Sequence, residues 1–324
     1  MSKTDNVWVG FDLGGTKMLA AVYDENFKAL GKAKQKTLGY QGQRAGLRRM
    51  IDVINEALAD ADVSTSHLAG IGVGCPGPIN PKSGILIEAP NLGWENVPIA
   101  DTLSETLGCP VVICNDVDAG VFAEYQFGAG RGSDCLIGIF PGTGIGAGAV
   151  IDGRLLHGSR LSCMELGHIP LYPETSGNGE GTTSLETECS RLKIASEASR
   201  AAYRGQAPKL LELCGTDLAN ITSGKLAKAI KGGDTAIEEI VKQAAILLGN
   251  GVATVVQLLA PDTIVLGGGL VEAMPKLYLE NVRKSARRRV LGPYKDSFEV
   301  VAAQLEDDAG VRGAAAWAKR KIES

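Results

Sequence analysis

Two glycine-rich stretches decide the fold: VGFDLGGTKMLAAVYD at residues 9–24 and IGIFPGTGIGAGAVID at residues 137–152. They align with each other without a gap. Each has an apolar strand, a Gly/Thr turn, a second apolar strand and an aspartate, which predicts a β-hairpin whose turn comes close to a ligand. Two such hairpins predict two related halves of the chain, and a chance match of two glycine-rich hairpins is the alternative.

The composition limits the class of protein. The chain has 324 residues, enough for roughly two domains of about 150 residues each. Hydrophobic residues make up 44% and charged residues 22%, as in a folded soluble protein. The net charge of −4, with both signs dispersed, argues against nucleic acid as a partner. We expect a cytoplasmic protein with no membrane partner, because no export signal and no long apolar run are visible.

The cysteines predict reduced thiols. There are seven, an odd number, and most lie in apolar segments such as PVVICND and SDCLIGIF. Such placement is typical of buried free cysteines in a cytosolic protein, and a disulfide framework is not expected.

Strands alternate with helices along the chain, which predicts an α/β protein. Helical patterns cover residues 44–61, 184–203, 235–259 and 309–322, and buried strands are expected at 69–77, 110–116 and 263–266. The repeat places a domain boundary just after Asp116. A smaller domain would comprise residues 1–116 with the C-terminal helix 306–324. A larger domain would comprise residues 117–305, including the second glycine-rich turn.

The first turn has the chemistry of a phosphate-binding loop. Gly14 and Gly15 let backbone N–H groups approach an anion, and Thr16 and Lys17 add donors. Neither turn has Walker spacing, and GTGIGAG at 142–148 is not a GxGxxG run entering a helix. Alone, each is equally well a tight turn. As a pair, they predict nucleotide phosphates held from two sides, with Asp12 near a divalent ion.

Asn115 and Asp116 end an otherwise apolar strand. A buried carboxylate is costly without a task or a partner. One interpretation is a general base that accepts a substrate hydroxyl proton during phosphoryl transfer. The alternative is an N-cap, supplied by Asp116 or Asp118, for a helix that begins near Ala119.

A further group of polar side chains suits the hydroxyls of a polyol. They are Asn91 in APNLGW, Glu165 and His168 in MELGH, and Glu186 in SLETECS. A histidine of the core and a first-turn helix acid are the alternatives for His168 and Glu186.

A series of motifs resembles the ROK family, whose name abbreviates repressor, open reading frame and kinase. They are GFDLGGTK at 10–17, GVGCPGPIN at 72–80, APNLGWENVPI at 89–99, ND at 115–116, GTGIGAG at 142–148, ELGH at 165–168, IVLGGGL at 264–270 and AGVRGAA at 309–315. The resemblance implies two duplicated actin/hexokinase-like (ribonuclease H-like) α/β domains around a central cleft. It also implies a sugar kinase that uses ATP and Mg²⁺, most similar to the glucokinase branch, which converts glucose to glucose 6-phosphate.

The resemblance further implies the role of each site residue. Asp116 would be the catalytic base. The sugar would be held by Asn91, Asn115, Glu165, His168 and Glu186. The nucleotide would be bound by Asp12, Gly14, Gly15, Thr16, Lys17, Gly142, Thr143, Gly144 and Gly146, with Gly267, Gly268 and Gly269 against the adenosine. Mg²⁺ would arrive with ATP near Asp12, and the chain would form a homodimer.

One stretch departs from the family pattern. Family members commonly carry CxCGxxGCxE after the GH, and its three cysteines join the histidine in a structural zinc site. Here GNGEGTTSLE at 177–186 has Gly177, Gly179 and Ser184 in their place. Because tetrahedral zinc needs about four ligands, no zinc is expected. A site rebuilt from Cys163 and Cys189 is a weak alternative.

Rival functions remain at this point. Within enzymes, the substrate could instead be N-acetylmannosamine, N-acetylglucosamine or fructose. A non-catalytic, sugar-sensing regulator of the same family is a second rival, although the residues before Gly10 are too few for a helix-turn-helix. An ATPase of the actin or chaperone type is a third, but it would not need Asn91, Glu165, His168 and Glu186 together.

Overall fold

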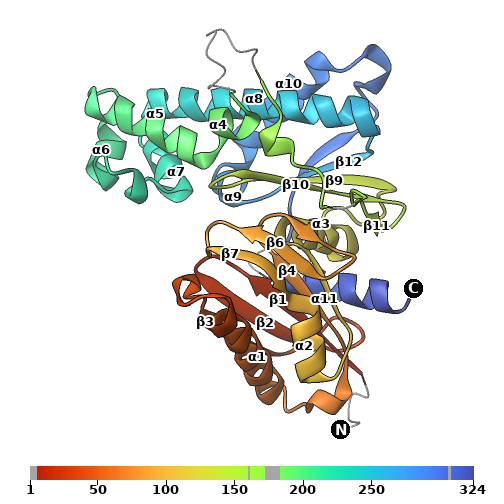
Figure 1. Cartoon of the computed structure of the whole chain (residues 1–324). Coiled ribbons are helices and arrows are strands. Elements are labelled where there is room, and N and C mark those ends of the chain that lie inside the picture. The colour runs from red at the N-terminus through yellow and green to blue at the C-terminus, as the bar shows by residue number, and fades with distance from the viewer. Residues whose placement is uncertain (1–5, 160, 172–182, 306–307) are drawn as a thin grey trace, which may run out of the picture. The chain divides into compact units, whose positions relative to one another are not determined.

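The computed structural model describes residues 6–159, 161–171, 183–305 and 308–324 (Figure 1). The chain forms two compact units. Unit 1 comprises Met1–Arg131, Gly153–Cys163 and Gln304–Ser324, and unit 2 comprises Gly132–Asp152 and Met164–Ala303. This division differs from the boundary expected after Asp116. Helix α3 (Asp116–Phe127) belongs to unit 1 because it packs along α11 (Ala309–Ile322) in that unit.

Unit 1 is built on a five-stranded sheet of order β3-β2-β1-β4-β8. The central strand β1 is antiparallel to β2 and parallel to β4, and β4 is parallel to β8. The strands are β1 (Val7–Leu13), β2 (Lys17–Tyr23), β3 (Ala29–Lys36), β4 (Leu68–Cys75) and β8 (Val111–Asn115).

Side chains of β1 alternate between two helix layers, as the period of a strand requires. Val9 and Phe11 pack with Met50 of α1 (Gln43–Asp60) in a core that also includes α2 (Ile99–Leu107). Trp8 packs instead with Val311 of α11. Helix α11 lies directly on the sheet backbone, because a Cβ at Gly10 would be 1.7 Å from the Val311 carbonyl oxygen. Glycine in GFD is therefore required for packing.

A small antiparallel sheet in unit 1 was not predicted. It consists of β5 (Ile79–Asn80), β6 (Ile85–Ala89) and β7 (Trp94–Pro98). The buried Trp94 anchors it, and its Nε1 donates to the Gly39 carbonyl oxygen at 3.3 Å. Asn91 lies in the turn between β6 and β7.

The second sheet repeats the strand order of the first, β11-β10-β9-β12-β13. Its strands are β9 (Cys135–Pro141), β10 (Ile145–Ile151), β11 (Arg154–Leu155), β12 (Thr263–Leu266) and β13 (Glu299–Ala302). Strand β9 is antiparallel to β10 and parallel to β12, like β1 with β2 and β4. In the gap-free alignment, β1 and β2 coincide with β9 and β10 residue for residue, which confirms the prediction of two related halves.

The helices of unit 2 are centred on α8, which packs along α10. They are α4 (Leu185–Cys189), α5 (Arg191–Tyr203), α6 (Pro208–Cys214), α7 (Ser223–Lys231), α8 (Thr235–Leu259), α9 (Gly269–Ala273) and α10 (Pro275–Arg289). Short 3₁₀ turns are η1 (Gly39–Gln41), η2 (Thr65–His67), η3 (Leu166–His168), η4 (Leu218–Asn220) and η5 (Gly292–Tyr294). Figure 1 shows α8 and α10 together over one face of the second sheet.

Two details of these helices bear on the predictions. The helix predicted over 184–203 is two helices, because Ser190 ends α4 and its hydroxyl accepts from the Lys193 N–H as the N-cap of α5. Among the described residues, α8 is the one helix long and apolar enough to cross a membrane. More than half of that apolar stretch is buried in the structure, which is typical of a core helix.

Two carboxylates hold the chain near points where it passes from one unit to the other. Glu124 is buried, and its oxygens accept from the N–H groups of Ala129 at 2.8 Å, Gln304 at 2.9 Å and Leu305 at 2.7 Å. In unit 2, Asp262 accepts from the Ser133 hydroxyl at 2.5 Å and from the Asp134 and Cys135 N–H groups at 2.8 Å. Burial alone would raise the pKa of Asp262, but these hydrogen bonds leave it below its ordinary value.

Candidate active site

The first glycine turn joins β1 to β2 and is held by a single residue. The Gly14 N–H donates to the Lys17 carbonyl oxygen at 3.0 Å. Thr37, which follows β3, donates from its hydroxyl to the Gly14 oxygen at 2.6 Å and from its N–H to the Thr16 oxygen at 2.9 Å. Gly15, Thr16 and Lys17 are exposed. The turn therefore presents donors to solvent from a fixed backbone.

Asp12, Asn115 and Asp116 meet at one edge of the first sheet. Asp12 pairs with Gly74 of β4, and Asn115 pairs with the adjacent Cys75. This is the carboxyl-end edge of the parallel strands, where ligands bind in α/β sheets. Burial raises the pKa of Asp12, and the charge of Lys17 opposes that effect. Burial also raises the pKa of the Cys75 thiol, with the charges of Asp116 and Asp12 adding to it.

Helix α3 begins at Asp116, and Asn115 is its N-cap. The Asn115 Oδ1 accepts from the Val117 N–H at 2.9 Å, and its Nδ2 donates to the Gly77 oxygen at 3.2 Å. The alternative of a helix that begins near Ala119, with Asp116 or Asp118 as its cap, is therefore wrong. Asp116 Oδ1 also accepts from the Val117 N–H at 2.9 Å. A helix N-terminus stabilises the negative charge of a carboxylate in its first turn.

Asn91 belongs to the same part of unit 1 as the first glycine turn. Its Cβ lies 3.7 Å from the position that a Cβ on Gly15 would occupy. The side chain is exposed. Of the sugar-binding residues implied by the resemblance, Asn91 and Asn115 lie in unit 1, and Glu165, His168 and Glu186 lie in unit 2.

The second glycine turn, between β9 and β10, is held by two charged residues from separate helices. Glu186 of α4 accepts from the Ile145 N–H through Oε2 at 2.7 Å. Arg191 of α5 donates from its N–H to the Gly142 oxygen and from Nη2 to the Thr143 hydroxyl, both at 2.9 Å. A Cβ at Gly144 would be 2.3 Å from Glu186 Oε2, so a side chain there would displace this carboxylate. Gly146 follows in β10 opposite Phe140.

Glu165 and His168 flank a short turn that packs on β10. A Cβ at Gly167 would be 2.4 Å from the Ile145 carbonyl oxygen, which explains the glycine in ELGH. The buried Leu166 anchors the turn, whereas Glu165 and His168 are exposed. His168 is thus a surface residue, and the alternative of a core histidine is wrong.

Gly267, Gly268 and Gly269 connect β12 to α9 beside the second glycine turn. Gly268 has φ +82°, and a Cβ there would be 3.1 Å from the Pro141 carbonyl oxygen. A cavity of about 580 Å³ opens at Gly269. Its lining also includes residues that were not predicted from the sequence: Arg191, Ala219, Thr222, Ser223, Gly224, Glu272 and Ala273. Arg191 thus both lines this cavity and donates a hydrogen bond to Thr143 of the second glycine turn.

The stretch that departs from the family pattern is held at its base by backbone pairing. Leu171 N–H donates to the Thr183 oxygen at 2.9 Å, and Leu185 N–H to the Ile169 oxygen at 3.0 Å. Ser184 forms a capping box with Thr187 at the start of α4. These contacts orient Glu186. Gly177 and Gly179 lie outside the described residues.

The cysteines give no support to a rebuilt zinc site. None of the seven, which all lie among the described residues, forms a disulfide, and these residues contain no cluster of three or more His, Cys, Asp or Glu that could hold a metal. Cys189 is buried, and burial raises its pKa to about 12, with Glu188 adding to that effect. The Cys163 thiol donates to the Leu156 oxygen at 3.1 Å.

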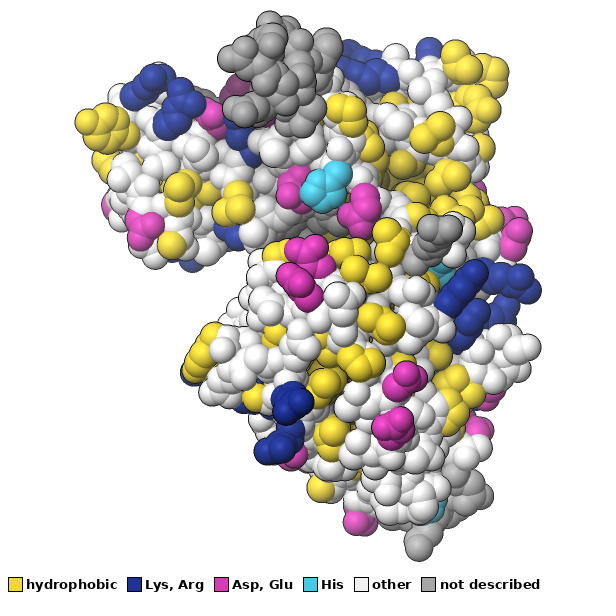
Figure 2. All heavy atoms as spheres, viewed as in Figure 1, with side chains coloured by type: hydrophobic (Ala, Val, Ile, Leu, Met, Phe, Trp, Pro, Cys, Tyr) yellow, Lys and Arg dark blue, Asp and Glu magenta, His cyan; other side chains and the backbone are white. Residues whose placement is uncertain are grey.

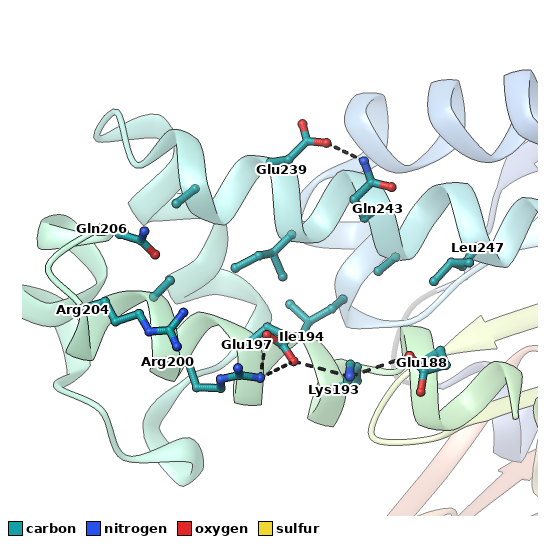
Figure 3. Close-up of a pocket in the computed structure, with 14 residues that line it drawn as sticks. Glu188, Lys193, Ile194, Glu197, Arg200, Arg204, Gln206, Glu239, Gln243 and Leu247 are labelled. Carbon is teal, nitrogen blue, oxygen red and sulfur yellow. Dashed lines mark hydrogen bonds and ion pairs between the residues drawn. The ribbon is translucent and has the colours of Figure 1, made fainter. Parts of the chain in front are cut away.

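A further cavity of about 480 Å³ in unit 2, between α5 and α8, contains none of the predicted site residues (Figure 3). Four of its charged lining residues are paired with one another. Lys193 lies 3.7 Å from Glu188 and 3.4 Å from Glu197, and Arg200 lies 3.1 Å from Glu197. Glu188, Lys193, Glu197 and Arg200 together thus carry no net charge.

Comparison with known proteins identifies the family. A model of the ROK family matches residues 8–321. The glucokinase of Thermotoga maritima is 32% identical over 97% of this chain and 98% of that protein. A xylose repressor of Caldicellulosiruptor bescii is 29% identical over 82% of this chain and 66% of that protein.

A solved structure agrees with this assignment. The ROK family glucokinase from Streptomyces griseus, in complex with glucose and AMPPNP, has a TM-score of 0.80 and 30% identity, covering 97% of this chain and 100% of that one. The likeness confirms the expected actin/hexokinase-like α/β fold. With the family model spanning nearly the whole chain, this protein belongs to the ROK family.

Proposed function

We propose that the chain is a sugar kinase that transfers the γ-phosphoryl group of Mg-ATP to the 6-hydroxyl of glucose. The observation that carries the proposal is the full-length likeness to a glucokinase solved with glucose and AMPPNP. The two glycine turns and the carboxylates at the sheet edge supply the chemistry that such a transfer needs. The protein acts in the cytoplasm as a homodimer, without nucleic acid or membrane partners.

Asp116 is the general base in this proposal. Its carboxylate accepts the proton of the attacking sugar hydroxyl while the γ-phosphoryl group is transferred. The bond from the Val117 N–H fixes one carboxylate oxygen, and the start of α3 stabilises the ionised form. Asn91, Asn115, Glu165, His168 and Glu186 orient the sugar. Glu186 keeps Oε1 for this role, because Oε2 holds Ile145.

The glycine turns bind the phosphates through those backbone N–H groups that are not already bonded within the turn, and through the Thr16 and Lys17 side chains. Gly14, Gly15, Thr16 and Lys17 act in unit 1, and Gly142, Thr143, Gly144 and Gly146 act in unit 2. Gly267, Gly268 and Gly269 lie against the adenosine, and the cavity at Gly269 gives it space. Mg²⁺ enters as part of the substrate. The Asp12 carboxylate fits it because hard oxygen ligands suit Mg²⁺ and a cation offsets the burial of the charge.

Asp116→Asn tests the proposal. Removing a general base lowers turnover by about 10²–10⁴-fold, and ATP binding and thermal stability should stay near wild type. ADP release is measured with Mg-ATP and glucose, with a sugar-free control. Wild-type turnover in D116N would contradict the assignment of the base.

A panel of acceptors and donors separates the rivals. Fructose, N-acetylmannosamine and N-acetylglucosamine replace glucose, and polyphosphate replaces ATP. The xylose repressor among the relatives favours a sugar-sensing regulator as the second candidate. Sugar binding with no ADP release on any sugar would favour that regulator. ADP release that does not depend on sugar would favour an ATPase.

A further inference from the structure

A basic cavity in unit 1 lies apart from every residue assigned above. It has a volume of about 530 Å³ and lies between β11 and the last turn of α11. Figure 2 shows Lys and Arg side chains gathered over these two elements. The residues that matter for its chemistry are Arg154, His157, Trp317, Arg320 and Lys321.

The positive charges of this cavity are not neutralised. Within the described part of the chain, Arg154, Arg320 and Lys321 form no ion pair with an acidic side chain. Glu323 on the rim pairs instead with Lys319 at 3.0 Å. In the cavity between α5 and α8, by contrast, the cations Lys193 and Arg200 are paired with Glu188 and Glu197. Uncompensated cations around a cavity attract an anion.

Helix electrostatics explains only part of the cluster. Lys and Arg side chains are favoured in the last turn of a helix because they face the negative end of its dipole, which accounts for Arg320 and Lys321. It does not account for Arg154, which comes from β11, or for a histidine beneath the cluster.

His157 connects the cavity to α3. Its ring lies edge-on to Trp317 with 5.6 Å between centroids, and neither ring nitrogen has a hydrogen-bond partner among the described residues. Its Nδ1 lies 4.0 Å from Oδ2 of the buried Asp118, two residues after Asp116. Burial lowers the pKa of His157, and the charge of Lys321 lowers it further. An anion on Lys321 would remove the second effect and favour the imidazolium beside Asp118.

Arg320 approaches α3 from another side. A Cβ at Gly153 would be 3.5 Å from Arg320 Nη2 and 3.3 Å from the Tyr125 hydroxyl. The guanidinium and a side chain of α3 therefore border the same glycine. Two routes, through His157 and through Arg320, lead from the cavity to the helix that starts at Asp116.

We propose that this cavity binds a small phosphorylated anion through Arg154, Arg320 and Lys321, and that the bound anion acts on α3 through His157 and Asp118. Guanidinium groups bind phosphoryl oxygens with paired, charge-assisted hydrogen bonds, so the two arginines suit this class of ligand. The site is separate from the proposed catalytic residues and does not depend on turnover.

Binding is tested by NMR of the full chain labelled with ¹⁵N-histidine. The chain has three histidines, so the ring signals of His157 can be assigned by substitution. Inorganic phosphate and glucose 6-phosphate are titrated separately, with sodium chloride at matched ionic strength. R154Q/R320Q removes two cavity charges. R44Q/R48Q removes two exposed charges from α1 of the same unit and is the matched control.

We expect a saturable shift of the His157 ring in the wild type and in R44Q/R48Q. The Kd for phosphate should rise at least about tenfold in R154Q/R320Q, because charge-assisted hydrogen bonds are lost. A shift with both anions identifies the phosphoryl group as the feature bound, and a shift with glucose 6-phosphate alone identifies a phosphorylated sugar. No shift with either anion, an equal shift with sodium chloride, or equal weakening in both double variants would overturn the site.

The link to α3 has its own measurement. Saturating phosphate should slow hydrogen exchange of the α3 amides in the wild type. H157Q should still bind phosphate, with Kd within about threefold because the cationic groups remain, but should show no slowing in α3. Unchanged α3 exchange in the phosphate-bound wild type would overturn the link. Neither measurement uses sugar phosphorylation, so failure here is distinguishable from failure of the proposed function.

Discussion

The two glycine turns occupy equivalent places in two related sheets, but they are held in different ways. The first is held by Thr37, a fully buried and uncharged residue of the same unit. The second is held by Glu186 and Arg191, two charged residues from α4 and α5. In the first turn, support and substrate binding are therefore the work of different residues. In the second, the proposed sugar ligand Glu186 is also the support.

The hairpins differ at one more equivalent position. Asp12 in β1 corresponds to Phe140 in β9, which packs against Gly267. Duplication has thus kept the backbone of the turn and changed the chemistry on either side of it. The variants below test whether the two turns respond as differently as their supports suggest.

Glu186→Ala should have the largest effect among the turn variants. It removes the acceptor of the Ile145 N–H and the proposed sugar contact together. Losing a hydrogen bond to a charged group costs about 1.5–3 kcal/mol, so kcat/KM for glucose should fall about 10–100-fold.

Thr37→Val is the matched change in the first turn. It removes the hydroxyl bond to Gly14 and should lower the free energy of unfolding by about 0.5–1.5 kcal/mol, with kcat/KM within about threefold of wild type. Steady-state kinetics and urea unfolding measure both quantities. Similar losses of activity in the two variants would mean that the supports do not differ in kind.

Gly144→Ala and Gly14→Ala should separate activity from stability. A Cβ at Gly144 meets the flexible end of Glu186 at 2.3 Å, so the carboxylate moves and kcat/KM for glucose falls about tenfold with the fold retained. A Cβ at Gly14 meets the Lys17 backbone oxygen at 2.7 Å, so the free energy of unfolding falls by about 1–3 kcal/mol. Gly292→Ala, which meets nothing within 4 Å and lies outside both turns, is the control. If G144A lost stability and G14A did not, the comparison would be reversed.

Arg191→Ala should affect the nucleotide and not the sugar. The Thr143 hydroxyl loses its partner at 2.9 Å, and the cavity at Gly269 loses a wall. We expect the KM for ATP to rise about three- to tenfold, as for one lost hydrogen bond, with the KM for glucose unchanged. Arg204→Ala, at the far end of α5, removes the same charge and should leave both values alone. A rise in the KM for glucose alone would contradict this role.

Asp12→Asn should have the smallest effect on the free energy of unfolding. The difference between wild type and D12N in this free energy should depend on pH. The pKa of Asp12 is raised in the folded state, mainly by burial, so the folded protein binds this proton more tightly than the unfolded chain does. Wild-type stability relative to D12N should therefore fall as pH rises from the ordinary pKa of aspartate through the raised one, and then level off. Urea unfolding from pH 3 to 8 measures the difference. A wild type that gains stability over this range would contradict the burial argument.

Much of the fold could be predicted because its decisive elements carry local patterns. The hairpins, α8, α11 and β12 follow from apolar periodicity and glycine placement, and the structure places them at the expected residues. Helix boundaries were less predictable. Ser190 is an ordinary polar residue in a helical pattern, and only the backbone shows that it caps α5. Asn115 likewise caps α3 and moves its start to Asp116.

In the candidate site, too, some residues could be predicted from the sequence and others could not. Glycines and strand-end carboxylates are visible in the sequence because their surroundings make them unusual. Arg191 carried no such signal, since an exposed arginine at a helix start is common and its partner Thr143 is distant in the chain. This contact depends on how α5 packs against the turn between β9 and β10, and a local sequence pattern cannot predict that packing. The three-stranded sheet of β5, β6 and β7 was missed because its strands are short.

The carboxylates Glu124 and Asp262 restrict where the backbone can act as a hinge. Ala303 N–H still bonds to Leu266 of unit 2, and the next N–H, of Gln304, already bonds to Glu124 of unit 1. At an earlier passage, Arg131 N–H bonds to Gly128, and the Ser133 hydroxyl and the Asp134 N–H both bond to Asp262, so Gly132 lies between the two anchored stretches. These are two of the four passages between the units, and the others fall at Asp152/Gly153 and Cys163/Met164. Where the carboxylates hold the chain, the backbone left free to change its torsion angles is one residue or one peptide link long, so a single inserted residue would multiply that freedom.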